Sequence, residues 1–137
     1  MKYLFLIGFL ICLNPVSAQD HKGKIIFNSV LKGGEQIKFG KKSILFKEVI
    51  SDSRCPKDVT CIWAGEAKVM LELFEDGKLV SEKSVVINTN IIDEIPLEFS
   101  VGGKIYCITG FKLFPYPSSA SKEDEINYTL EMQVSEN

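Results

Sequence analysis

Alternation of apolar and polar residues with a period of two is the feature that most constrains the fold of this chain. It is clearest in two segments, 67–74 and 128–134, where an apolar residue occupies every second position. Because side chains of a strand point alternately to its two faces, this spacing predicts strands with one face in a core. No window of ten or more residues carries the 3.6-residue apolar stripe of a helix. The chain is therefore expected to be all-β.

Turn residues divide the rest of the chain into further strands. Asp76-Gly77 is the strongest hairpin signal, and it predicts a return strand after the segment that begins at residue 67. Pro115 ends an apolar strand, because proline cannot continue a ladder, and Gly110 within that strand indicates a bulge or a bend. The remaining strands are expected over residues 25–31, 36–39, 43–49, 79–87, 97–101 and 104–114.

About seven short strands between turns predict a single antiparallel β-sandwich with an Ig-like or Greek-key arrangement. A small β-barrel is the alternative, because alternation alone does not distinguish a closed sheet from two packed sheets. The sequence shows no internal repeat and no long linker, so one domain is expected over residues 19–137.

Residues 1–18 have the layout of a secretory signal peptide. Lys2 supplies the positive start, residues 3–13 form an apolar run, Pro15 interrupts it, and small residues precede a cleavage point after Ala18. The apolar run is shorter than the roughly 20 residues that cross a bilayer, so no transmembrane segment is expected in the mature chain. Lipidation at Cys12 is disfavoured, because a small residue should precede a lipidated cysteine. We therefore predict a secreted protein, which is periplasmic or extracellular after cleavage of the signal peptide near Ala18.

Cleavage after Ala18 leaves three cysteines. In an oxidising compartment an odd number means one pair and one remaining thiol, or an intermolecular bond. Cys55 and Cys61 are close together in a turn-rich segment and are the predicted pair, a staple that contributes about 2 kcal/mol through chain entropy. Cys107 lies in an apolar strand and is predicted to be a buried, inert thiol, with an intermolecular bond or a reactive thiol as alternatives.

The loop that holds the predicted disulfide also contains the only arginine and the only tryptophan of the chain. One interpretation is structural. Asp52 forms an Asx turn and pairs with Arg54, or Arg54 donates to nearby carbonyl groups, while Pro56 stiffens the loop. Trp63 then covers the disulfide or the end of the sandwich, and Gly65 lets the chain approach another segment closely.

A second interpretation of the same loop is functional. Arg54, Trp63 and Glu66 would form an exposed recognition patch, because arginine and tryptophan are the residues that most often dominate interfaces. Loops that a rigid scaffold holds in place are where binding residues concentrate.

Residues 52–65 read D-S-R-C-P, then four residues, then C-x-W-A-G. This pattern resembles a family of small secreted bacterial proteins that has no established activity. A looser likeness extends to the preceding strand and to Pro115-Tyr116-Pro117. The resemblance implies a bacterial envelope or secreted setting and implies no particular chemistry.

Composition argues against several functional classes. A formal charge of -2 is unsuited to binding phosphate backbones, so no nucleic-acid partner is expected. The single histidine, His21, lies in the polar leader, so a cysteine nucleophile has no nearby base. Asp52, Asp58 and Glu66 lack the spacing of a calcium loop. We therefore expect no enzyme, no cofactor and no metal.

Three hypotheses for function remain at this point. The first is a non-enzymatic binding or envelope-associated module whose stapled loop meets an unidentified protein or envelope component. The second is a protease inhibitor that presents Arg54-Cys55-Pro56 as a rigid, preorganised segment. The third is a carrier of a small apolar ligand inside a barrel.

Overall fold

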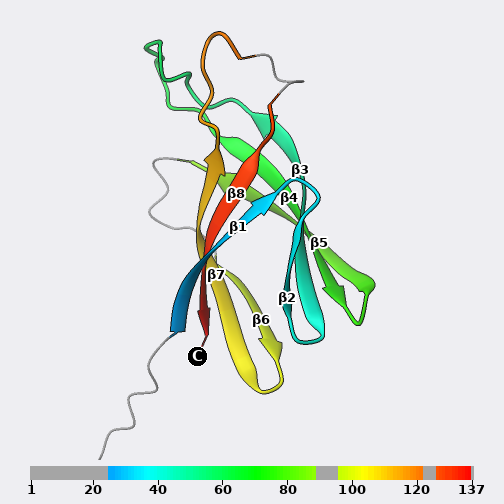
Figure 1. The fold of residues 1–137 in the computed structure, drawn as a ribbon. Coiled ribbons are helices and arrows are strands. Elements are labelled where there is room, and N and C mark those ends of the chain that lie inside the picture. Colours follow the sequence, from blue (N-terminus) through cyan, green and yellow to red (C-terminus); the bar gives the residue numbers. More distant parts are fainter. Residues whose placement is uncertain (1–24, 89–95, 122–125, 137) are drawn as a thin grey trace, which may run out of the picture.

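A computed structural model describes residues 25–88, 96–121 and 126–136, and in them it shows eight strands and no helix (Figure 1). Accordingly, this part of the chain has no helix with the length and apolar character needed to span a bilayer. The predicted signal peptide, Cys12 and His21 lie outside the described residues. The strands are β1 Ile25–Lys32, β2 Gln36–Phe39, β3 Lys42–Asp52, β4 Ala67–Glu75, β5 Lys78–Ile87, β6 Leu97–Val101, β7 Lys104–Phe114 and β8 Thr129–Glu136.

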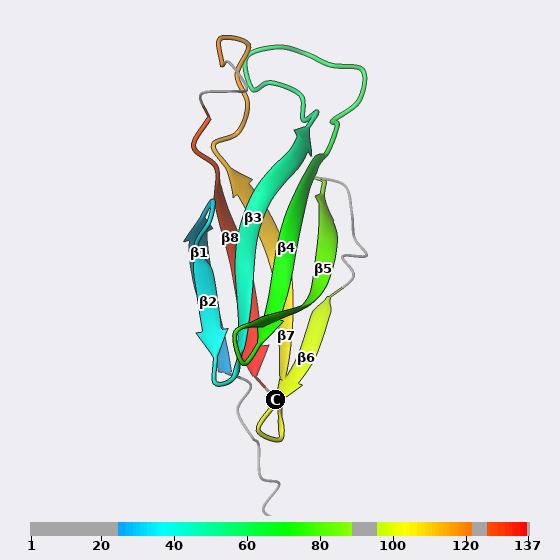
Figure 2. The same cartoon turned by 90° about the vertical axis from the view of Figure 1, so that its right-hand side faces the viewer.

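The strands form two antiparallel four-stranded sheets, with the orders β1-β8-β7-β6 and β2-β3-β4-β5. The sheets lie face to face and do not close into a barrel (Figure 2). The predicted all-β sandwich is confirmed, with eight described strands where about seven were expected.

The path of the chain is simpler than the expected Ig-like or Greek-key arrangement. Among the described strands, β2 to β5 pair in sequence order in one sheet, and β6 to β8 do so in the other. The exception is β1, which pairs with β8 along its whole length. Each predicted strand is present within a few residues of its expected bounds, so the difference lies in the connections and not in the elements.

Two local signals in the sequence are confirmed in the backbone. Asp76 and Gly77 both have positive φ angles, 50° and 76°, as a tight hairpin turn requires. Gly110 has a φ of 63°, and the register of β7 against β8 shifts between Thr109 and Lys112. This shift is the predicted bulge. The extra residue reverses which alternate positions of β7 face the core. Ile108 before the bulge and Phe111 after it therefore both point into the core.

The core lies between the sheets and is filled by aliphatic and aromatic side chains. At the end of the sandwich away from the β3–β4 loop, the rings of Phe39, Phe99 and Tyr106 pack together from β2, β6 and β7, with centroids 5.0 to 5.5 Å apart. The buried apolar residues are Leu31, Phe39, Ile44, Phe46, Ala67, Val69, Leu71, Ile108, Phe111, Leu113, Leu130, Met132 and Val134.

Candidate functional site

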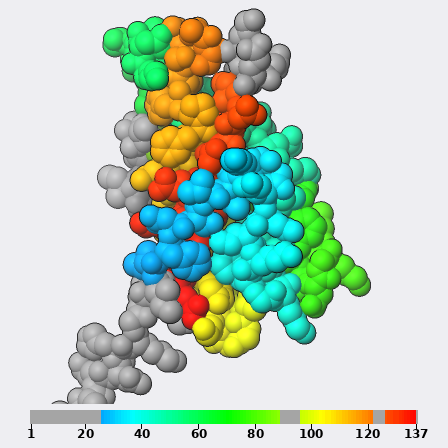
Figure 3. Space-filling view, in the orientation of Figure 1, coloured from blue at the N-terminus to red at the C-terminus, as the bar shows by residue number. Residues whose placement is uncertain are grey.

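The loop that connects β3 to β4, residues 53–66, lies at one end of the sandwich beside residues 115–121 (Figures 1 and 3). Its two arms continue the pairing of the strands from which they come. The N–H of Ser53 donates to the carbonyl of Glu66 at 2.8 Å, and the N–H of Cys55 donates to the carbonyl of Ala64 at 2.7 Å. The base of the loop is therefore an extension of the central hairpin of its sheet.

Cys55 and Cys61 form the predicted disulfide, with Cα atoms 5.9 Å apart. The bond closes the distal part of the loop just beyond the last backbone pair. Pro56, which follows the first cysteine, is half-buried against the loop. The predicted staple is thus present, and it restrains the outer part of the β3–β4 loop.

Asp52 and Arg54 make a paired contact below the disulfide. The backbone N–H of Arg54 donates to Oδ1 of Asp52 at 3.2 Å, which is the predicted Asx turn. Its guanidinium donates from Nε to Oδ1 at 2.8 Å and from Nη2 to Oδ2 at 2.7 Å. Both side chains are only 4% exposed. The pair is therefore a bidentate, buried salt bridge.

The same guanidinium reaches the other sheet. Nη1 of Arg54 donates to the carbonyl of Leu113 at 2.7 Å, and Nη2 donates to the carbonyl of Pro115 at 3.1 Å. The ring of Tyr116 lies 4.7 Å from the guanidinium carbon, within range of a cation–π contact. Arg54 therefore joins the β3–β4 loop to the end of β7.

Opposing effects act on the carboxyl group of Asp52. Burial alone would raise its pKa, because it removes water from the charged form. The hydrogen bonds and the charge of Arg54, together with a hydrogen bond from the hydroxyl of Tyr128 at 3.1 Å, outweigh burial and hold the pKa of Asp52 below its ordinary value. The ion pair is therefore formed at neutral pH.

Gly65 closes the base of the loop. Its φ is 70°, and a Cβ atom at this position would lie 1.9 Å from the carbonyl oxygen of Ser53. That distance is far inside van der Waals contact and involves backbone, which cannot swing away as a side chain can. The expectation that a small residue is needed here for close approach is confirmed.

A second set of contacts fixes the loop to residues 115–121. The N–H of Lys57 donates to the carbonyl of Pro117 at 3.0 Å. The carboxylate of Asp58 accepts from the N–H of Ser119 at 2.8 Å and also from its hydroxyl. These hydrogen bonds lower the pKa of Asp58. The loop is thus held at its base, at the disulfide and along its side.

The outer part of the loop presents apolar side chains to solvent. Ile62 is 96% exposed and Trp63 is 73% exposed, and Val59 is about half exposed. The expectation that Trp63 covers the disulfide or the end of the sandwich is therefore wrong. No signal in the sequence singled out Ile62 or Val59.

The predicted recognition patch is only partly present. Trp63 is at the surface, but Arg54 is buried and its donors are engaged, and Glu66 is half-buried with its carbonyl in the loop pairing. The structure brings Trp63 together with Ile62 and Val59 on one loop instead. The inhibitor hypothesis requires Arg54 to enter the pocket of a protease. Because its side chain is buried, Arg54 is not available for this contact.

Cys107 is a free thiol in β7 and is half-buried, not fully buried as expected. The carbonyl of Cys107 accepts a hydrogen bond from the hydroxyl of Ser135 at 3.2 Å. Among the described residues, no three His, Cys, Asp or Glu side chains are grouped as a metal site would require.

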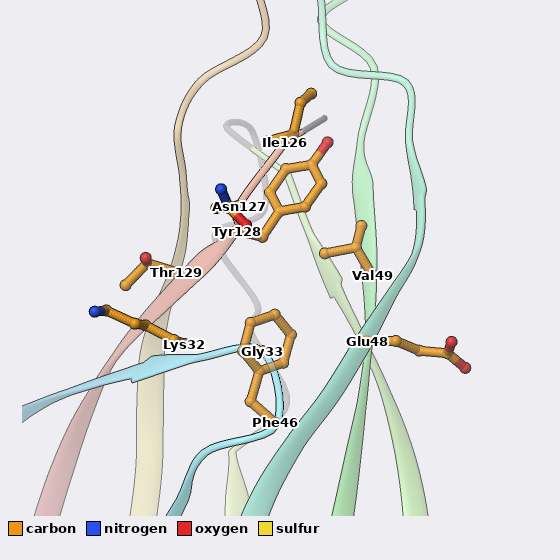
Figure 4. Close-up of a pocket in the computed structure, with 9 residues that line it drawn as sticks. All are labelled: Lys32, Gly33, Phe46, Glu48, Val49, Ile126, Asn127, Tyr128 and Thr129. Atoms are coloured by element: carbon orange, nitrogen blue, oxygen red, sulfur yellow. The ribbon is translucent and has the colours of Figure 1, made fainter. Parts of the chain in front are cut away.

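A cavity of about 570 Å³ opens between the sheets near the turn that joins β1 to β2. The rings of Phe46 and Tyr128 and the side chain of Val49 face it, whereas the charged ends of Lys32 and Glu48 point away (Figure 4). Its wall is therefore mixed, with apolar side chains toward the core and nearly as much polar surface around them.

Comparison with protein-family models, curated proteins and solved structures finds no match to this chain. The resemblance of residues 52–65 to small secreted bacterial proteins therefore stays a prediction.

Proposed function

We propose that the protein is a non-enzymatic binding module of the bacterial envelope or the secreted fraction, and that its β3–β4 loop contacts a protein or envelope partner. The signal-peptide layout of residues 1–18 supports export, and an exported protein can keep the Cys55–Cys61 disulfide oxidised. The position of the single histidine, His21, in the polar leader supports a role other than catalysis.

The observation that carries this proposal is the exposure of Ile62 and Trp63 on a restrained loop. A flexible loop would lose conformational entropy on binding, and a loop held at three places has already lost most of it. Large apolar side chains that are exposed on such a loop lower the free energy of a complex when a partner covers them. Arg54 contributes indirectly, because it anchors the loop through Asp52 and Leu113.

The test is a pull-down from envelope fractions with matched variants. The double variant Ile62→Ser/Trp63→Ser removes the apolar surface of the loop. The control, Leu79→Ser/Val80→Ser, removes two other apolar side chains that are more than half exposed, at the β4–β5 hairpin at the far end of the sandwich (Figure 2). A partner that the wild type and the control retain, and that the loop variant loses, supports the proposal.

A partner retained equally by all three proteins would contradict it. The partner should then be purified and titrated against each protein. We expect the loop variant to weaken binding by about 2 kcal/mol or more, as for side chains that dominate an interface.

The cavity in Figure 4 supports a second candidate, a carrier of a small apolar ligand. Its volume falls within the range of ligand sites in proteins, roughly 300–1,000 Å³. Native mass spectrometry of protein purified from its host should then detect a bound small molecule. The variant Val49→Trp, which fills the cavity, should lose that molecule, whereas the loop variant should keep it.

A further inference from the structure

The edge strands of this sandwich differ in how they are protected against pairing with another chain. Among the described strands, β1, β6, β2 and β5 lie at sheet edges. β2 and β6 have only four and five residues. β5 carries three charged residues and an extra residue, Val80, at a register shift against β4. Short length, charge and bulges are the usual protections of an edge.

β1 has none of these protections. It is eight residues long and keeps one unbroken register with β8 from Ile25 to Lys32. Its sequence, IIFNSVLK, contains no proline and has a charge only at its last residue. In Figure 3 the strand lies at the surface that faces the viewer. A long, regular and mostly apolar edge of this kind is a template for adding a strand.

The hydrogen bonds of Lys32 show which backbone groups of β1 face the open edge. Its N–H donates to Oε2 of Glu35 at 2.8 Å, and its carbonyl accepts from the N–H of Glu35 at 2.9 Å, so both point away from β8. Antiparallel ladders alternate in direction from residue to residue. Ile26, Asn28 and Val30 therefore also direct their N–H and C=O groups to the open edge, where no described residue accepts or donates.

Side chains of the same three residues lie on the outer face of the sheet. Ile26 and Val30 are each 58% exposed, so both present aliphatic surface to solvent. They stand on either side of Asn28, at i-2 and i+2, so they are arranged symmetrically about it.

We propose that two copies of this protein pair antiparallel through β1, with the two-fold axis at Asn28. This register sets Ile26 opposite Val30 of the second copy, and Asn28 opposite its own equivalent, with each pair exchanging two hydrogen bonds. The β1-β8-β7-β6 sheets of the two copies then form one continuous sheet of eight strands. Each apolar side chain gains an apolar cross-strand neighbour on the outer face.

The symmetry of the strand favours this register over its neighbours. Moving the axis to Ser29 would set Ile26 opposite Lys32, whose backbone groups are already bonded to Glu35. Moving it to Phe27 would set Val30 opposite residue 24, which is outside the described residues. The register at Asn28 alone uses all three open residues and pairs apolar with apolar.

The test is the oligomeric state of the full chain, expressed with its own N-terminal segment and purified as the host processes it. We expect sedimentation equilibrium to give a dimer for the wild type. Val30→Lys places a charge on the edge and should raise the dimer dissociation constant at least about tenfold. Val80→Lys is the matched control, because Val80 is 61% exposed on another edge strand, and it should remain dimeric.

A second variant tests the register itself. Asn28→Cys, made together with Cys107→Ser, should form a disulfide between copies under mild oxidation, because paired positions place Cα atoms within disulfide range. Ser84→Cys on β5, in the same background, is the control. A wild type that stays monomeric, equal dimerisation of the two lysine variants, or equal crosslinking of the two cysteine variants would each overturn the proposal.

Discussion

The guanidinium of Arg54 is one of the points at which the β3–β4 loop is joined to both sheets. It combines a bidentate bond to Asp52 with bonds to the carbonyl groups of Leu113 and Pro115, so most of its donors are used inside the protein. An arginine in a loop is often a binding residue, but here its burial gives it an anchoring role. The surface that it holds in place belongs to Ile62 and Trp63.

The carboxyl group of Asp52 makes stability depend on pH. Its pKa in the folded protein is lowered below the ordinary value of 3.8, because the bonds and charge of Arg54 outweigh the effect of burial. A lowered folded pKa stabilises the fold fully above the unfolded pKa, and this contribution is lost as the pH falls through the folded value. We expect the free energy of unfolding in urea to drop below about pH 4 through this group.

Asp52→Asn isolates that contribution. The difference in unfolding free energy between the wild type and Asp52→Asn should be constant from pH 7 to about pH 5 and should shrink below pH 4. Glu48→Gln removes an exposed carboxylate on the same strand and serves as the control. A difference between wild type and Asp52→Asn that does not change between pH 2 and pH 5 would contradict the assignment.

Gly65 and Gly77 offer a matched test of close packing at the base of the loop. Both have positive φ, 70° and 76°, but only Gly65 has backbone where a Cβ would lie. Gly77→Ala should therefore cost about 1 kcal/mol through backbone strain alone. Gly65→Ala should cost at least about 3 kcal/mol, because the carbonyl of Ser53 must also move.

Denaturant unfolding of both variants measures these costs. Similar losses of stability in the two alanine variants would show that the loop relaxes freely around Gly65, and that its base is not rigid.

At the scale of the elements, bulges decide which side chains face the core. The sequence predicted one bulge through Gly110, because a glycine inside a strand adopts positive φ easily and often lies at a bulge. The two register shifts in β3, after Phe46 and after Val49, carry no such residue. At a bulge, two residues of one strand lie opposite a single residue of the partner strand. The sequence of β3 alone therefore does not show where its extra residues lie.

The disulfide should stabilise the loop more than the fold. Cys55→Ser/Cys61→Ser is expected to lower the free energy of unfolding by about 2 kcal/mol, the chain-entropy value for so short a ring. The β-sheet signal in circular dichroism should remain, because the pairing of Ser53 with Glu66 and the Arg54 contacts do not depend on the sulfur atoms.

Reductant provides the internal control for the disulfide. It should destabilise the wild type by a similar amount and leave the double serine variant unchanged. A loss of cooperative unfolding in that variant would mean that the staple supports the whole sandwich.

At the scale of the whole molecule, the pairing of β1 with β8 joins residues that are about a hundred positions apart in sequence. Ile25 is opposite Glu136, so the two ends of the described sandwich are neighbours. Elsewhere the described strands pair in sequence order within each sheet, and the chain passes from one sheet to the other between β1 and β2 and between β5 and β6. Because the two ends of the described sandwich are neighbours, we expect the fold to tolerate a different starting point along the chain.

A circular permutant tests this order. Residue 136 is joined to residue 25 by a short Gly/Ser linker, and the chain is opened between Asp76 and Gly77 in the β4–β5 turn. We expect cooperative unfolding, with stability within about 2 kcal/mol of the wild type, because the break lies in an exposed turn. A permutant opened between Met70 and Leu71, inside the central strand β4, should not fold.

Circular dichroism shows whether each permutant folds, and urea unfolding measures its stability. Failure of the first permutant to fold, with β1 and β8 joined as the register requires, would contradict the strand order.

The sequence by itself determined the class of fold, the positions of the strands, the hairpin at Asp76-Gly77 and the disulfide. These depend on the alternation of neighbouring residues, on glycine and proline geometry, and on two cysteines six positions apart. Only the tertiary structure decided the strand order, the burial of Arg54 and the exposure of Trp63. Each of these depends on contacts between distant segments, above all the bond from Arg54 to Leu113 of β7 and the bond from Tyr128 to Asp52, which no local pattern encodes.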